Sequence, residues 1–188
     1  MKRKSWMVSI AVMAGSFAAE AQAHVGVHAA GLAAGMIHPF TGLDHLLAMI
    51  AVGAWAAQQG GRARWAVPLA FVAMMAAGGA WGGLGGWLPG VESGIAASVL
   101  VLGLLIAFSA RLPLAAGMAL VGAFALFHGY AHGVEMPAGS PLYALGFVLS
   151  TALLHAAGLG AGLALKARLV RLGGAGLALA GMWMLAGI

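Results

Sequence analysis

The sequence predicts an all-α integral membrane protein, a six-helix transmembrane bundle that follows a cleaved signal peptide. Three observations carry this prediction: the composition, six apolar stretches and the pattern of the first 23 residues. Of the 188 residues, 63% are hydrophobic and 7% are charged, whereas roughly 25% of the residues of an ordinary soluble domain are charged. A soluble fold of this size would have to expose much of that apolar surface to water. The composition therefore excludes an ordinary soluble domain.

The composition also narrows the classes of function. The 31 glycines lie among Ala, Leu and Val without a collagen period, which is typical of close helix packing in lipid. The formal net charge is +5, but the Lys and Arg residues are scattered and form no basic face, so no nucleic-acid partner is expected. Because the chain has no cysteine, any metal ligands must be nitrogen, oxygen or thioether groups.

The first 23 residues have the three parts of a secretory signal peptide: a basic start, an apolar run and a small-residue ending Ala21-Gln22-Ala23. The apolar run of about 14 residues is shorter than the roughly 20 that a transmembrane helix needs. We therefore predict a cleaved signal peptide over 1–23 and one transmembrane domain over 24–188. An uncleaved first transmembrane helix is the alternative.

Six apolar stretches of the domain are each about long enough to cross the hydrocarbon core as a helix. They are approximately residues 31–57, 65–82, 91–109, 113–132, 141–165 and 170–187. The connections between them are short, so one compact bundle in a lipid bilayer is expected.

Positive charges give an independent indication of orientation. The basic residues of 24–188 all follow the first, third or fifth stretch: Arg62, Arg64, Arg111, Lys166, Arg168 and Arg171. Because Lys and Arg concentrate in cytoplasmic connections, these ends are predicted to be cytoplasmic. The processed N-terminus and the C-terminus are then expected on the outer, periplasmic side of a bacterial-type inner membrane.

The first polar cluster, His38-Pro-Phe-Thr-Gly-Leu-Asp44-His45, lies inside the first stretch, where ionisable residues are costly and are functional candidates by default. Pro39 predicts a break at His38, with Pro39 beginning the main helix. Two helical turns would then place His45 below His38, with Gly42 admitting another helix. Asp44 is either a metal ligand or an acceptor that orients a histidine.

The second polar cluster, His128-Gly-Tyr-Ala-His132-Gly-Val-Glu135, lies at the outer end of the fourth stretch. The spacing i, i+4, i+7 places His128, His132 and Glu135 on one helix face. Two imidazoles one turn apart can hold a single divalent ion, and Gly129 and Gly133 are expected to leave room beside them.

The two clusters fall near the same predicted membrane surface. Their histidines and acids together predict a metal or cation site. The proposed ligand set is His38, Asp44, His45, His128, His132 and Glu135. A structural polar network, in which each histidine hydrogen-bonds a neighbouring helix, is the alternative.

Four further residues are candidates for an accessory role. Glu92 precedes the third helix, where it would either stabilise the helix N-terminus or attract cations. His155 lies well inside the fifth stretch, as a deeper binding station or as a hydrogen-bonding group between helices. His24 and His28 would capture metal together with the terminal amine, or belong to a solvated end.

The motif H-x5-D-H from His38 to His45 and the motif F-H-G-x-A-H-G-x-E from Phe127 to Glu135, after a signal peptide, resemble the HupE/UreJ family of nickel and cobalt permeases. That family is associated with hydrogenase and urease maturation. The resemblance covers essentially the whole of 24–188. It implies a six-span permease domain for which Ni²⁺ or Co²⁺ is the transported substrate, with no permanently bound cofactor and with the six residues above as the functional set.

Imidazole and carboxylate ligands suit borderline divalent ions, but their spacing alone does not separate Ni²⁺ from Co²⁺ or Zn²⁺. Two other classes stay open: a haem-binding electron carrier with axial histidines, and a structural or accessory membrane protein that transports nothing. An enzyme is not expected, because the H-E-x-x-H motif is absent and the short connections leave no room for a soluble catalytic domain.

Overall fold

The computed structural model describes residues 31–136 and 140–187, so the predicted signal peptide, His24 and His28 lie outside the described residues. The described part consists of helices joined by short turns. They are α2 (Leu32–Ile37), the 3-10 helix η1 (His38–Phe40), α3 (Leu43–Gln59), α4 (Ala63–Gly83), α5 (Val91–Ala107), α6 (Leu114–Glu135), α7 (Pro141–Ala164) and α8 (Ala167–Gly187). The prediction of an all-α fold is confirmed for these residues.

Four of these helices, α4, α6, α7 and α8, are long and apolar enough to cross a membrane. The bent pair formed by α2–η1 and α3 makes a fifth span if it is counted as one. Helix α5 is apolar but has only 17 residues. A multi-pass membrane protein is therefore supported, whereas the number of six spans and the cleavage of the signal peptide stay predictions.

The first apolar stretch is not one continuous helix, because α2–η1 and α3 meet at 86°. The hydroxyl and the backbone N–H of Thr41 both donate to the carbonyl of His38, at 2.7 and 3.0 Å, and close a 3-10 turn. Gly42 is then extended, with φ −103°. The predicted break is confirmed, but the prediction that Pro39 begins the main helix is wrong, since that helix begins at Leu43.

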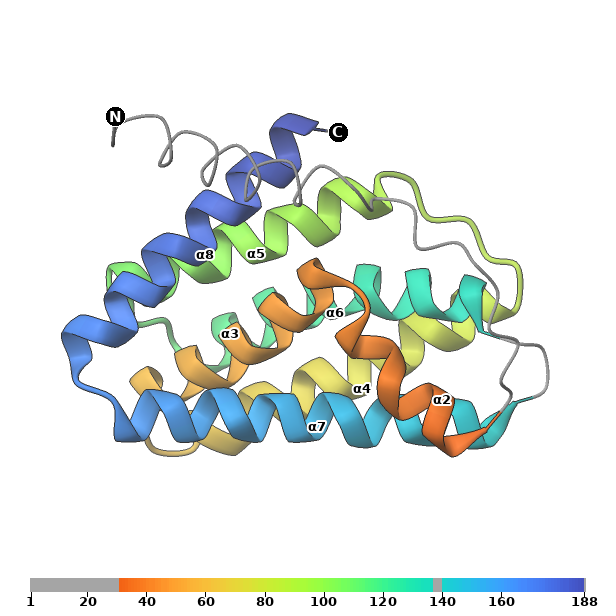
Figure 1. Ribbon diagram of the computed structural model, residues 1–188, viewed down its shortest axis with the longest axis horizontal. Coiled ribbons are helices and arrows are strands. Elements are labelled where there is room, and N and C mark those ends of the chain that lie inside the picture. Colours follow the sequence, from red (N-terminus) through yellow and green to blue (C-terminus); the bar gives the residue numbers. More distant parts are fainter. Residues whose placement is uncertain (1–30, 137–139, 188) are drawn as a thin grey trace, which may run out of the picture.

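Helices that are distant in sequence pack in pairs: α4 with α6, α5 with α8, and α3 with α7 (Figure 1). Between α4 and α6 the backbones are in direct contact. A Cβ atom built on Gly129 would lie 2.0 Å from the carbonyl oxygen of Met75. One built on Gly133 would lie 2.1 Å from the carbonyl oxygen of Gly79. The prediction that these two glycines leave room beside the histidines is therefore wrong, because the space is filled by the backbone of α4.

Polar side chains of α3 fix one end of the bundle. The indole N–H of Trp55 and the amide of Gln59 donate to the carbonyl of Ala110, at 3.0 and 2.8 Å, and the amide of Gln58 donates to the carbonyl of Ile106 at 3.1 Å. A helix leaves its last carbonyl groups without partners in its own backbone. The side chains of α3 therefore hold the C-terminal end of α5 in place.

The same end carries the positive charge of the described chain. Its six basic residues lie at the turns from α3 to α4, from α5 to α6 and from α7 to α8, or in the first turns of α4 and α8. The acids Asp44, Glu92 and Glu135 lie at the opposite ends of their helices, at the start of α3 and α5 and at the end of α6. In Figure 1 the turns at the left of the bundle form the basic end. Which end faces the cytoplasm stays a prediction.

Candidate metal centre

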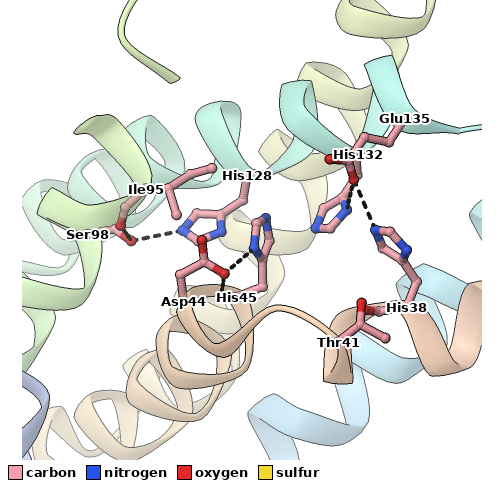
Figure 2. Close-up of polar contacts among 9 residues, drawn as sticks. All are labelled: His38, Thr41, Asp44, His45, Ile95, Ser98, His128, His132 and Glu135. Atoms are coloured by element: carbon pink, nitrogen blue, oxygen red, sulfur yellow. Dashed lines mark hydrogen bonds and ion pairs between the residues drawn. The ribbon is translucent and has the colours of Figure 1, made fainter. Parts of the chain in front are cut away.

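The histidines of the two sequence motifs lie in a single row (Figure 2). The ring centroids are 4.7 Å apart for His38 and His132, 4.2 Å for His132 and His45, and 4.7 Å for His45 and His128. Along the row, η1, α6, α3 and α6 each contribute one imidazole in turn. The side chains of the two motifs thus alternate along the row. In the sequence, more than half of the described chain lies between His38, the first residue of the first motif, and Glu135, the last residue of the second.

The bend at η1 sets this order. A continuous helix would have stacked His45 below His38 on one face, and that prediction is wrong. The bend instead places the two rings on either side of His132. The spacing within α6 is confirmed: His128 and His132 share the helix face that meets the row.

The exposed end of the row is a three-ligand group of His38, His132 and Glu135. The carboxylate oxygen Oε2 of Glu135 lies 3.2 Å from Nε2 of His38 and 3.9 Å from Nδ1 of His132. One ligand atom from each residue lies within 4.8 Å of the others. The side chains of Glu135 and His38 are 45% and 26% exposed, whereas that of His132 is 8% exposed. Two imidazoles and a carboxylate form a donor set that suits borderline divalent ions.

Asp44 orients the next imidazole. Its Oδ1 accepts the backbone N–H of His45 at 2.7 Å and lies 2.8 Å from Nδ1 of the same ring. A carboxylate in this position accepts a hydrogen bond from Nδ1–H, so the unprotonated nitrogen of the neutral His45 ring is Nε2. That Nε2 is buried and has no hydrogen-bond partner in the described part of the chain. Of the two roles predicted for Asp44, the geometry favours the orienting acceptor over the direct ligand.

Ser98 orients the imidazole of His128 in the same way. Its hydroxyl donates to the carbonyl of Ile95 at 2.6 Å and lies 2.8 Å from Nε2 of His128. Because a serine hydroxyl has one proton, Ser98 accepts from the Nε2–H of His128, and the unprotonated nitrogen is Nδ1. This Nδ1 is also buried without a partner among residues 31–136 and 140–187.

Ser98 was not among the residues predicted for the site. A single serine in an apolar transmembrane helix usually hydrogen-bonds within its own helix or to a neighbour, so its type and position give no signal for a site. Only the contact between α5 and α6 places its hydroxyl beside His128.

Of the four accessory candidates, the two that the structure describes, Glu92 and His155, do not join the row. Glu92 lies in the first turn of α5 and is exposed, and both of its predicted roles stay open. His155 is buried in α7, where its ring contacts Phe71 with 5.0 Å between centroids. The ring centroid of Phe71 in turn lies 5.7 Å from that of His128. His24 and His28 are outside the described residues.

Gly42 is part of the support of the site. A Cβ atom on Gly42 would lie 2.9 Å from Oδ1 of Asp44 and 3.2 Å from Nδ1 of His45. The prediction that Gly42 admits another helix is therefore wrong, because the neighbouring atoms belong to the Asp44–His45 pair.

We expect Gly42→Ala to displace this pair and to lower the affinity of the candidate site for a divalent probe ion such as Ni²⁺ by roughly 10-fold or more, as loss of an orienting partner does in metal sites. Equilibrium dialysis of the purified protein with radioactive nickel measures the affinity. Gly160→Ala is the matched control, because a Cβ there meets nothing within 4 Å. Equal affinities in the two variants would contradict this role of Gly42.

Known proteins resemble the chain over most of its length. The family model described as HupE / UreJ protein matches residues 10–184, which include both histidine motifs. The chain is 52% identical over 142 residues to the protein HupE of Rhizobium leguminosarum bv. viciae, and the match covers 74% of each chain. No solved structure matches the chain. On the family match and this identity, the chain belongs to the HupE/UreJ family.

Proposed function

We propose that this protein takes up Ni²⁺, or Co²⁺, across the cytoplasmic membrane and supplies the metal for the maturation of enzymes such as hydrogenase or urease. The observation that carries the proposal is the row of four imidazoles, which begins at His38, beside the exposed Glu135, and ends at the fully buried His128. The family is linked to nickel and cobalt handling for hydrogenase and urease, and this link supports the choice of metal.

In the proposed mechanism, the exposed three-ligand group captures the hydrated cation. Glu135 supplies negative charge at the surface, and the imidazoles of His38 and His132 replace part of the water shell. A divalent ion in a low-dielectric interior needs such compensation, because burying an isolated charge is costly.

The ion then moves along the row by exchange of ligands. Neighbouring rings are 4.2–4.7 Å apart, so an ion can bind the next imidazole before it leaves the last. Asp44 and Ser98 keep His45 and His128 in tautomers whose unprotonated nitrogens are buried without partners in the described chain. Binding at each position must stay weak enough for the ion to leave again.

The membrane potential would drive this movement. With the inside negative, a divalent cation moving inward gains roughly 4.6 kcal/mol per 100 mV, twice the value for a single charge. The predicted orientation, with the basic end in the cytoplasm, places the exposed end of the row on the side from which nickel arrives.

The geometry disfavours the two alternative classes. A haem would need its porphyrin between two axial imidazoles, whereas the rings of His45 and His132 are in contact, with 4.2 Å between centroids. A purely structural polar network would satisfy its buried atoms. Instead, both ring nitrogens of His132 are buried and lack a hydrogen-bond partner among the described residues, and buried polar atoms are seldom left so.

Uptake of radioactive nickel, in cells that lack other nickel importers, tests the proposal. Cells that express the protein are expected to accumulate nickel above the empty-vector level. His45→Ala is expected to lower the rate by roughly 10-fold or more, because it removes a ligand whose orienting partner alone is worth roughly 10–100-fold in metal sites. Leu153→Ala is the control, since this side chain is exposed on α7 at 59%. Wild-type uptake in His45→Ala at equal expression would refute the proposed path.

A further inference from the structure

A fifth imidazole is buried in the bundle without a role in the row. His155 is 3% exposed, and neither of its ring nitrogens has a hydrogen-bond partner within the described ranges. Buried polar side chains nearly always have a hydrogen-bond partner. An imidazole with two unpaired nitrogens in a membrane helix is therefore a candidate for a ligand that occupies its lone pair.

His155 lies deeper in the bundle than the row. It is 14 residues beyond Pro141, where α7 begins, which is roughly 21 Å at about 1.5 Å per residue. The ring of Phe71 contacts both His155 and His128, with 5.0 and 5.7 Å between centroids. The backbone at this point is fixed, because a Cβ on Gly53 of α3 would lie 2.0 Å from the carbonyl oxygen of His155. A single aromatic ring thus separates the last histidine of the row from His155.

Two further donor atoms lie about one helical turn from His155, on its side away from the basic end. Thr151 is one turn before His155 on the same face of α7, and Met75 is one turn after Phe71 on α4. The hydroxyl of Thr151, which is fully buried, lies 3.7 Å from Sδ of Met75. Two contacts therefore join α4 and α7 one helical turn apart: Met75 with Thr151, and Phe71 with His155.

We propose that His155, Met75 and Thr151 form a second, inner cation station, which receives a partly dehydrated transition-metal ion from His128, the buried end of the row. This inference rests on the proposed uptake of nickel. The station offers an imidazole, a thioether and a hydroxyl, and the three acids of the described chain lie elsewhere, at the starts of α3 and α5 and the end of α6.

This donor set gives the station a specificity of its own. Mg²⁺ and Ca²⁺ require oxygen ligands, whereas imidazole and thioether donors favour borderline and softer ions. Because the station carries no formal charge, it binds a divalent ion more weakly than the exposed group with its carboxylate. Weaker binding at the inner position permits release.

A separate cavity lies nearer the basic end than His155. Gly162 lies seven residues, or two turns, after His155 on α7, and it lines a cavity of about 190 Å³ together with Gln58 and Ser109. The side-chain oxygen of Gln58 is buried and has no partner in the part of the chain that the structure describes. A cavity of this size holds several water molecules, at roughly 30 Å³ each. Arg111, which also lines it, disfavours retention of a cation.

Equilibrium dialysis of the purified, full-length protein against radioactive nickel, combined with uptake in cells, tests the inner station. We expect two bound ions per wild-type chain, one per chain in His155→Leu, and uptake lowered about 10-fold in this variant. Ala156→Leu is the matched control, because it adds the same side chain at a neighbouring exposed position. One bound ion in the wild type, or two bound ions with unchanged uptake in His155→Leu, overturns the inference.

Met75→Leu keeps the shape of the core and removes only the sulfur. In X-ray absorption at the nickel edge, we expect sulfur scattering from the fully loaded wild type and none from Met75→Leu. Absence of sulfur scattering in the loaded wild type overturns the assignment of Met75, even where His155→Leu fails to fold. The failure of the proposed function is distinct: the wild type would then take up no nickel, whereas failure of the inner station leaves wild-type uptake intact.

Discussion

Replacing His132 with alanine is expected to abolish nickel uptake and to lower Ni²⁺ affinity by roughly 100-fold or more. His132 belongs both to the exposed three-ligand group and to the row, since it lies beside Glu135, His38 and His45. Loss of an orienting partner alone costs roughly 10–100-fold in metal sites, and His132→Ala removes a ligand. Nickel dialysis and cell uptake, both at matched protein level, measure the two effects.

The position of His132 also predicts which substitutions lower nickel uptake more than others. His38→Ala is expected to be milder, because His132 and Glu135 still face each other across 3.9 Å when His38 is removed. His132→Phe separates ligation from packing. In the wild type the ring centroids of His132 and Phe147 are 4.1 Å apart, and the phenyl ring of the variant keeps this contact. We expect this variant to have a Tm close to the wild type and no uptake. Greater loss in His38→Ala than in His132→Phe would show that His132 is not the central ligand.

That these residues gather in one place could be predicted from the sequence, because ionisable residues are rare in membrane helices. Against an apolar background, the spacing of His128, His132 and Glu135 is a periodic signal, and one helix face does carry all three to the site. The pairing of the first cluster with the second followed from the alternation of the basic connections, which placed both at one end.

The order of the ligands could not be predicted. A proline indicates that a helix breaks, but where the chain resumes its helix depends on tertiary contacts. Here the 3-10 turn closed by Thr41 and the extended Gly42 set an 86° bend, and the bend puts His38 and His45 on either side of His132. Local sequence carries no information on that angle.

The roles of several small residues could not be predicted either. Ser98 and the glycines of α6 have the same types and surroundings as many residues that merely fill a membrane bundle. Their roles come from the partner helix: Ser98 contacts His128 across α5 and α6, and Gly129 contacts the backbone of α4. Helix pairing between distant parts of the chain decides such roles, and one sequence does not display it.

The contact at Gly129 has a large expected consequence. A Cβ at this position would lie 2.0 Å from the carbonyl oxygen of Met75 and 2.8 Å from its Cα. Because backbone atoms cannot rotate away, Gly129→Ala must push α6 away from α4. Overpacking a core costs about 1–3 kcal/mol when side chains can adjust, so a clash with backbone is expected to cost at least that much.

The same displacement reaches the candidate metal centre, because His128 is the residue before Gly129. We expect Gly129→Ala to lower the Tm of the purified protein and to lower uptake of nickel more than 10-fold even in the fraction that folds. Gly160→Ala is the control for the change of residue type: its Cβ meets nothing within 4 Å, and alanine stabilises a helix interior by roughly 0.5–1 kcal/mol relative to glycine. Opposite shifts of Tm are therefore expected from the same substitution on two helices. Equal shifts would mean that α4 and α6 are not held in backbone contact at Gly129.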